Sequence, residues 1–182
     1  MRRRFGWTSL LLSVLISCFA ATGSGGRDHL IEKILEQFPG YHVVTVAERN
    51  YDAREFIQRH FARDNPSIVR GDFDGDGYLD YAILLKNDKT GTAKVAMLLC
   101  SGDAECRDVC DVDVSTSFIE VYLRPTPIGT RVSQTEAIDT KDYPPPTKLH
   151  SVGIEVNYFG KAKVVYYWHK KAKKMEALQT ED

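Results

Sequence analysis

The residues from Asp72 to Asp80, Asp-Phe-Asp-Gly-Asp-Gly-Tyr-Leu-Asp, constrain this chain more than any other segment. They place carboxylates at the first, third, fifth and ninth positions, around Gly75 and Gly77. A hard divalent cation takes about six to eight oxygen ligands, and a short segment supplies them only by curling around the ion. Glycine permits the positive φ that such curvature needs. The sequence therefore predicts a calcium loop.

The predicted calcium ligands are the backbone carbonyl of Tyr78 and the side chains of Asp72, Asp74, Asp76 and Asp80. An EF-hand would need Glu at its twelfth position, where this chain has Ile83. The flanking residues 67–69 and 81–85 are β-branched, aromatic and aliphatic, which is typical of strands. We therefore expect a strand-loop-strand site. A polar turn in which Asp and Gly only satisfy backbone groups is the alternative.

Residues 69–81, Val-Arg-Gly-Asp-Phe-Asp-Gly-Asp-Gly-Tyr-Leu-Asp-Tyr, resemble the calcium loop of the FG-GAP and VCBS-type repeats of integrin-α propellers and bacterial surface proteins. The resemblance implies the same ligand positions and covers this segment alone. The motif occurs once, whereas a propeller needs one unit per blade. We therefore expect no propeller. The loop and the β-rich half after it look like small exported bacterial proteins of unassigned function, a likeness that implies no activity.

The amino terminus predicts export. Residues 1–21 begin with a cluster of arginines, and the apolar run at 7–16 is shorter than the roughly 20 residues that span a bilayer. Two cleavage patterns compete: a lipobox that would end at a lipidated Cys18, and small residues at 19–23 that suit ordinary signal peptidase. Residues 22–27 are expected to form a flexible linker. The protein would be periplasmic or secreted, or a membrane-anchored lipoprotein.

Charge and length limit the partners. The chain has 24 basic and 25 acidic residues, and loss of residues 1–21 removes three arginines and leaves a net charge of −4. Nucleic acid is not expected to bind, because such proteins carry a strongly basic face. Residues 28–182 suffice for one domain. We expect a monomer whose partner is an unknown protein or an envelope polymer.

The cysteines after the signal are Cys100, Cys106 and Cys110, spaced C-x5-C-x3-C. They permit one internal disulfide and leave one thiol, which fits an oxidising compartment. Cys100 is expected to pair with Cys106 or Cys110. Zinc is disfavoured because no C-x-x-C pair or nearby His completes a tetrahedral set.

Hydrophobic spacing predicts an α+β fold with N-terminal helices packed on an antiparallel sheet of hairpins. Helices are expected at 30–38 and 56–61, the second capped by Asp52 and carrying a partly buried His60. Strands are expected at 41–46, 81–86, 92–100 and 117–123, followed by an irregular loop at 124–151. A three-stranded meander is expected over 154–158, 164–168 and 174–180.

The sequence favours a non-catalytic, calcium-binding envelope or surface domain, because it lacks G-x-S-x-G, H-E-x-x-H, P-loop and G-x-G-x-x-G motifs. One alternative is a periplasmic inhibitor or immunity protein that binds an enzyme or toxin through a loop around Pro144–Pro146. The third is a calcium-dependent hydrolase. The lysines of 170–174 form a basic turn that either only solvates a hairpin or contacts anionic envelope polymers.

Overall fold

A computed structural model describes residues 25–61, 65–102, 105–135 and 147–181. The helices are α1 (Gly25–Leu35), α2 (Tyr51–His60) and the short 3-10 helices η1 (Val46–Glu48) and η2 (Ser115–Glu120). The strands are β1 (Tyr41–Val43), β2 (Ile68–Gly71), β3 (Asp80–Asn87), β4 (Ala93–Cys100), β5 (Cys106–Asp113), β6 (Val121–Thr126), β7 (Arg131–Val132), β8 (Thr147–Lys148), β9 (Gly153–Tyr158), β10 (Ala162–His169) and β11 (Lys174–Glu181). None of the helices in these ranges is long and apolar enough to cross a membrane.

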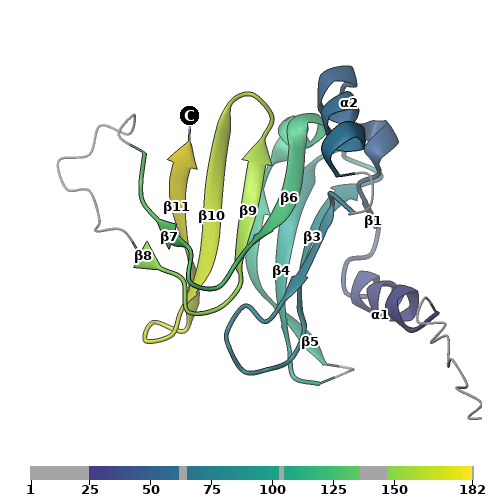
Figure 1. The fold of residues 1–182 in the computed structure, drawn as a ribbon. Coiled ribbons are helices and arrows are strands. Elements are labelled where there is room, and N and C mark those ends of the chain that lie inside the picture. The colour runs from purple at the N-terminus through teal and green to yellow at the C-terminus, as the bar shows by residue number, and fades with distance from the viewer. Residues whose placement is uncertain (1–24, 62–64, 103–104, 136–146, 182) are drawn as a thin grey trace, which may run out of the picture.

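The strands form two antiparallel sheets and a small hairpin (Figure 1). The N-terminal sheet has the order β1-β3-β4-β5, with β2 pairing along the same strand β3 as β1. The C-terminal sheet has the order β11-β10-β9-β6, and β7 pairs with β8. The predicted α+β domain of antiparallel hairpins is thus confirmed, and the described strands close into neither a barrel nor a propeller. One sheet was expected where two are found.

The main core lies between the two sheets. Val95 and Met97 of β4 belong to one buried cluster with Ile154 and Val156 of β9. Helix α1 covers the opposite face of the N-terminal sheet, where its Ile34 packs in a second cluster with residues of β3 and β4. The two central strands are therefore buried on both faces, which explains why they read as continuous apolar runs rather than alternating ones.

The predicted elements and the structure differ at several boundaries. Helix α1 begins at Gly25, so the end of the predicted 22–27 linker is helical. Asn50, not Asp52, caps α2, because its side chain accepts the N–H of Ala53 at 2.9 Å, and His60 is exposed. The signal segment 1–21, with Cys18, lies outside the described residues.

The region after β5 is more regular than predicted. Residues 117–120 complete η2, and the strand expected at 117–123 instead begins at Val121. The expected loop 124–151 contains the end of β6 and the β7–β8 hairpin, because Val132 and Leu149 join a buried cluster on the outer face of the C-terminal sheet. Residues 136–146, with the Pro144–Pro146 run, are outside the described residues.

Candidate metal centre

The acidic loop connects two paired strands. Strands β2 and β3 are antiparallel, with Gly71 opposite Asp80, so residues 72–79 form the connection of a hairpin. Gly75 and Gly77 have φ of +80° and +93°, a backbone conformation that residues with a Cβ rarely adopt. The structure thus has the strand-loop-strand arrangement that the flanking residues predict, and the glycines make the predicted turns.

The aspartates at the start of the loop accept its backbone N–H groups. The carboxylate of Asp72 accepts from Gly75 at 2.6 Å, from Asp76 at 3.1 Å and from Gly77 at 3.0 Å. Asp74 accepts the N–H of Asp76 at 3.1 Å. These bonds hold the chain in a tight curve around the Asp72 side chain. Such a curve occurs both in cation-binding loops and in Asx-type turns.

Three of the predicted ligands come together. Asp72, Asp74 and Asp80 each offer one carboxylate oxygen, and these oxygens lie within 4.8 Å of one another. Asp76 is exposed and is not a member of this group, and its carboxylate accepts the N–H of Tyr78 at 2.8 Å. The participation of Asp76 and of the Tyr78 carbonyl therefore remains a prediction. The three clustered oxygens are a donor set that could hold a metal ion.

Asp80 is the unusual member of the group because it is fully buried. Its Oδ2 accepts the N–H of Phe73 at 2.7 Å and its Oδ1 accepts the N–H of Cys100 at 2.9 Å. Burial raises the pKa of Asp80 to about 6, even though both hydrogen bonds lower it, and the charges of Asp74 and Asp76 raise it further. Among the described residues, no Lys, Arg or His forms an ion pair with this carboxylate.

The loop is also tied to the segment that leads into the C-terminal sheet. The hydroxyl of Ser151 donates to the carbonyl of Phe73 at 2.5 Å, and the N–H of Val152 donates to the carbonyl of Asp72 at 3.1 Å. Gly71 lies so close that a Cβ there would meet a methyl of Val152 at 2.7 Å. The contacts of Ser151 and Val152 with the loop were not predicted, since no local sequence pattern marks a contact between these distant segments.

The cysteine pairing is resolved beside the loop. Cys100 and Cys106 form a disulfide across paired positions of β4 and β5, and Cys110 is a half-buried free thiol. A cavity of about 230 Å³ lies between this disulfide and the loop, and Asp74, Asp76 and Glu105 are among its lining residues. The predicted disulfide is confirmed, with Cys106 as the partner of Cys100.

Comparison with protein-family models, with curated proteins and with solved structures returned no match. The likeness of residues 69–81 to the FG-GAP and VCBS loops therefore remains a sequence prediction.

Proposed function

We propose that the loop 72–80 binds one structural calcium ion in an exported, non-catalytic envelope or surface domain. The observation that carries the proposal is the buried carboxylate of Asp80, which lies within 4.8 Å of oxygens of Asp72 and Asp74. A buried charge is costly unless it is paired, and two further carboxylates increase that cost. A divalent cation would remove it.

The donor chemistry favours calcium. The three clustered groups are carboxylates, and hard oxygen donors suit Ca²⁺ and Mg²⁺ rather than soft metals. The predicted Asp76 carboxylate and Tyr78 carbonyl would add two oxygens, toward the six to eight that calcium takes at about 2.3–2.6 Å. A polar turn alone would account for the bonds of Asp72, but it needs no buried carboxylate at the far end of the loop.

A structural role follows from where the loop is attached. Asp80 begins β3, a central strand, while Asp72 and Phe73 contact the segment before β9 of the other sheet. An ion held by Asp72, Asp74 and Asp80 would therefore fix the position of both sheets at this end. The disulfide is compatible with an oxidising, extracytoplasmic compartment. The alternative of a periplasmic inhibitor or immunity protein is not supported by any described contact, because Pro144–Pro146 lie outside the described residues.

The test is calcium titration of the metal-stripped protein by calorimetry, with thermal melts in calcium, in magnesium and in chelator. We expect one calcium per chain, and a melting temperature raised by about 5–10 °C when calcium is about 100-fold above its dissociation constant. Asp74→Asn keeps an acceptor for the N–H of Asp76 but loses the charge, so it should abolish both effects. Magnesium should bind more weakly than calcium.

The matched control is Asp52→Asn, which removes an exposed carboxylate from the first turn of α2. It should bind calcium as the wild type does. The proposal fails if calcium produces no heat and chelation leaves the melting temperature unchanged, in which case the loop is only a polar turn.

A further inference from the structure

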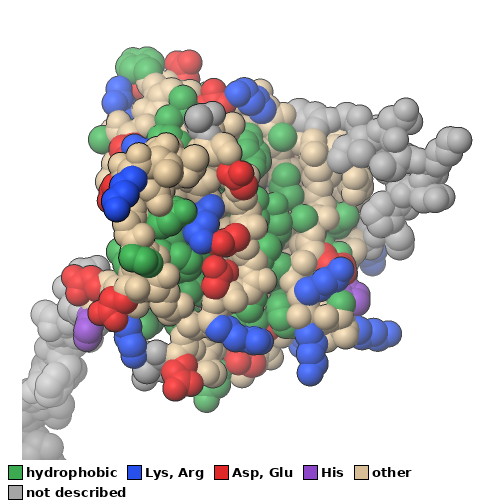
Figure 2. Space-filling view, turned by 180° about the vertical axis from the view of Figure 1, so that it is seen from behind, with side chains coloured by type: hydrophobic (Ala, Val, Ile, Leu, Met, Phe, Trp, Pro, Cys, Tyr) green, Lys and Arg blue, Asp and Glu red, His purple; other side chains and the backbone are tan. Residues whose placement is uncertain are grey.

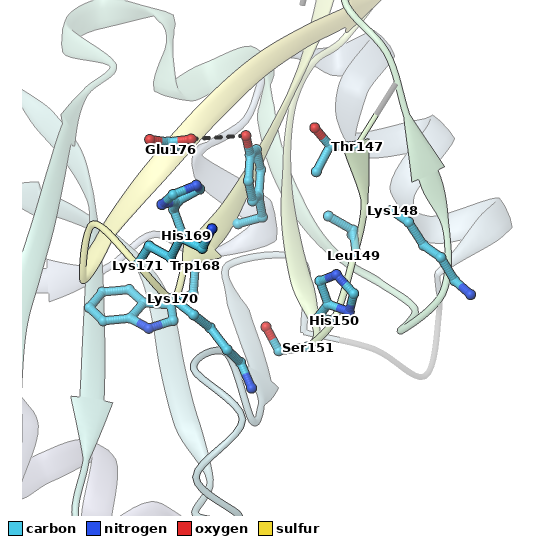
Figure 3. Close-up of a pocket in the computed structure, with 11 residues that line it drawn as sticks. Thr147, Lys148, Leu149, His150, Ser151, Trp168, His169, Lys170, Lys171 and Glu176 are labelled. Carbon is cyan, nitrogen blue, oxygen red and sulfur yellow. Dashed lines mark hydrogen bonds between the residues drawn. The ribbon is translucent and has the colours of Figure 1, made fainter. Parts of the chain in front are cut away.

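A second cavity among the described residues lies away from the acidic loop. It has a volume of about 460 Å³ and lies between residues 147–151 and the end of β10 with its turn, residues 167–171. Figure 3 shows side chains from both segments around it, and its dashed line marks the bond from the Tyr167 hydroxyl to Glu176, 3.0 Å long. The volume falls in the range of roughly 300–1,000 Å³ that is typical of small-ligand sites.

Cationic side chains line this cavity. Lys148, Lys170 and Lys171 are exposed, and within the described ranges none of them forms an ion pair. Among the described lining residues the one acid is Glu176, which already accepts the Tyr167 hydroxyl and has Lys174 at 3.5 Å. Viewed from behind, Lys, Arg and His side chains gather at the lower right, where β10 turns into β11 (Figure 2). Of the described residues that line the cavity, Lys148 and Lys171 therefore carry positive charge that no described acid pairs.

His169 adds an oriented donor. Its Nδ1 accepts the backbone N–H of Ala172 at 3.0 Å, so the neutral ring must carry its proton on Nε2. The Nε2 proton takes no part in the hydrogen bond of the turn, which is made by Nδ1, and it can be donated to a ligand oxygen. His150 also lines the cavity and is exposed. The polar groups of the cavity are thus mainly donors.

Aromatic side chains complete the lining. Tyr167 packs against the buried cluster of Val132, Leu149, Val165 and Leu178, and Trp168 packs against the core between the sheets. Both residues are half-buried, but as neighbours in β10 they point to opposite faces of the sheet, so Tyr167 is the ring on the same face as Leu149, which also lines the cavity. A partly exposed aromatic ring beside hydrogen-bond donors suits a ligand with a flat, weakly polar face. An isolated inorganic anion would not use this ring and would occupy a small part of the volume.

We infer that this cavity binds an acidic sugar, in which a phosphate or carboxylate group meets Lys148, Lys171 and His169 while the ring lies against Tyr167. The sugar is either free or a residue of an anionic polymer. The site shares no carboxylate with the proposed calcium loop. Lys170 does approach that loop, since its Nζ is 3.0 Å from where a Cβ of Gly75 would lie, so the test avoids Lys170.

The test follows backbone amide resonances of the full-length protein by nuclear magnetic resonance during separate titrations. The probes are glucose 1-phosphate, glucuronate, a galacturonate tetramer, inorganic phosphate and neutral glucose. We expect the acidic sugars to shift resonances of residues 147–151 and 167–171, and to bind more tightly than phosphate or glucose. The Lys148→Gln/Lys171→Gln variant should weaken their binding about tenfold, because it removes two of the charges that meet the anionic group.

The matched control is Lys33→Gln/Lys89→Gln, which removes equal charge from exposed positions of α1 and the β3–β4 turn. It should bind the sugars as the wild type does. Binding of the tetramer alone would assign the site to a polymer. The inference is overturned if none of the acidic sugars shifts these resonances, if glucose or phosphate binds as tightly, or if both double variants weaken binding equally.

Two further measurements separate this site from the calcium proposal. The Lys148→Gln/Lys171→Gln variant should keep the thermal response to calcium, and Asp74→Asn should keep sugar binding in chelator. If calcium binding fails while sugar binding survives, only the calcium proposal falls. The reverse result removes only the cavity assignment.

Discussion

The backbone N–H of Cys100 donates a 2.9 Å hydrogen bond to Oδ1 of Asp80, and so strand β4 holds the last carboxylate of the acidic loop. The other carboxylate oxygen is held from within the loop by the N–H of Phe73. Asp80 is therefore the last residue of the candidate metal centre. Its side chain also links strand β3 to strand β4 and to the loop that precedes β3. Its structural contribution can be measured separately from any metal.

Asp80→Ala should be strongly destabilising even in chelator. The substitution leaves the buried N–H groups of Phe73 and Cys100 without their acceptor, and each such group costs about 1–3 kcal/mol. We expect a loss of about 2–5 kcal/mol in urea unfolding. Asp76→Ala removes an exposed carboxylate that accepts one exposed N–H, and should cost less than about 1 kcal/mol. Equal losses would contradict the role assigned to Asp80.

Removal of the disulfide should also destabilise the protein. Cys100 and Cys106 close a short loop, with a sequence separation of 6, and the chain-entropy relation gives about 2 kcal/mol for a loop of this length. We expect that loss for the Cys100→Ser/Cys106→Ser variant in urea unfolding. Cys110→Ser is the control and should cost less than about 1 kcal/mol, because Cys110 is half-buried and unpaired. Non-reducing peptide mapping that joins Cys110 to Cys100 would overturn the assignment.

Glu48 should make stability depend on pH at the acidic end. Burial raises its pKa, but hydrogen bonds from Thr45, Lys86 and His42 outweigh burial and bring the pKa to about 2. Because the unfolded chain has the higher pKa, the contribution of Glu48 is present above about pH 4.5 and is lost as the pH falls toward 2. Glu48→Gln should therefore cost about 1–2 kcal/mol at pH 6, with the difference vanishing near pH 2.

The control for this prediction is Glu55→Gln, which removes a carboxylate that pairs with the exposed Arg59. Its effect should be within about 0.5 kcal/mol at both pH values.

His42 contributes a pH dependence of stability with the opposite sign. Burial lowers the pKa of His42, but the hydrogen bonds and charges of Glu48 and Asp88 outweigh burial and raise it. Its contribution is present below pH 6.5 and is lost as the pH rises through the raised value. If the loss of stability caused by Glu48→Gln grew as the pH falls, the lowered pKa of Glu48 would be contradicted.

Arg49 should be more important to stability than its position in a connection indicates. It is buried, and its guanidinium donates to the carbonyls of Val121 at 2.9 Å and Thr45 at 2.8 Å and to the hydroxyl of Ser67 at 2.7 Å. These bonds join the segment before α2 to both sheets. Burial lowers the pKa of Arg49 to about 10, but it remains charged at neutral pH.

Arg49→Lys should therefore cost about 2–4 kcal/mol, because a single ammonium cannot reach all three acceptors and leaves some of them unsatisfied. Arg59→Lys is the matched control, since Arg59 is exposed and pairs only with Glu55 among the described residues. It should change the free energy of unfolding by less than about 0.5 kcal/mol. Thermal or urea unfolding of the two variants side by side is the measurement, and similar losses would show that the buried bonds of Arg49 contribute little.

Features that depend on near neighbours in the chain could be predicted from the sequence. The spacing of aspartates and glycines in 72–80 gave a loop between strands, and the alternation in 154–158 and 164–168 gave paired strands, since φ preferences and the side-chain period act over a few residues. The predicted ends of helices and strands were wrong where tertiary packing decides where an element begins. The strand expected at 117–123 begins only at Val121, because the buried Val114 and Phe118 pack residues 115–120 as η2 against the core.

The sequence by itself determined which residues form the acidic loop, its glycine conformations and the antiparallel, mixed character of the fold. The tertiary structure alone decided that Asp80 is buried against Cys100, that Cys106 rather than Cys110 completes the disulfide, and that the basic turn closes a cavity with residues 147–151. These features join segments far apart in the chain. Spacing fixes local geometry, whereas burial and charge compensation depend on which distant surfaces the hydrophobic core brings together.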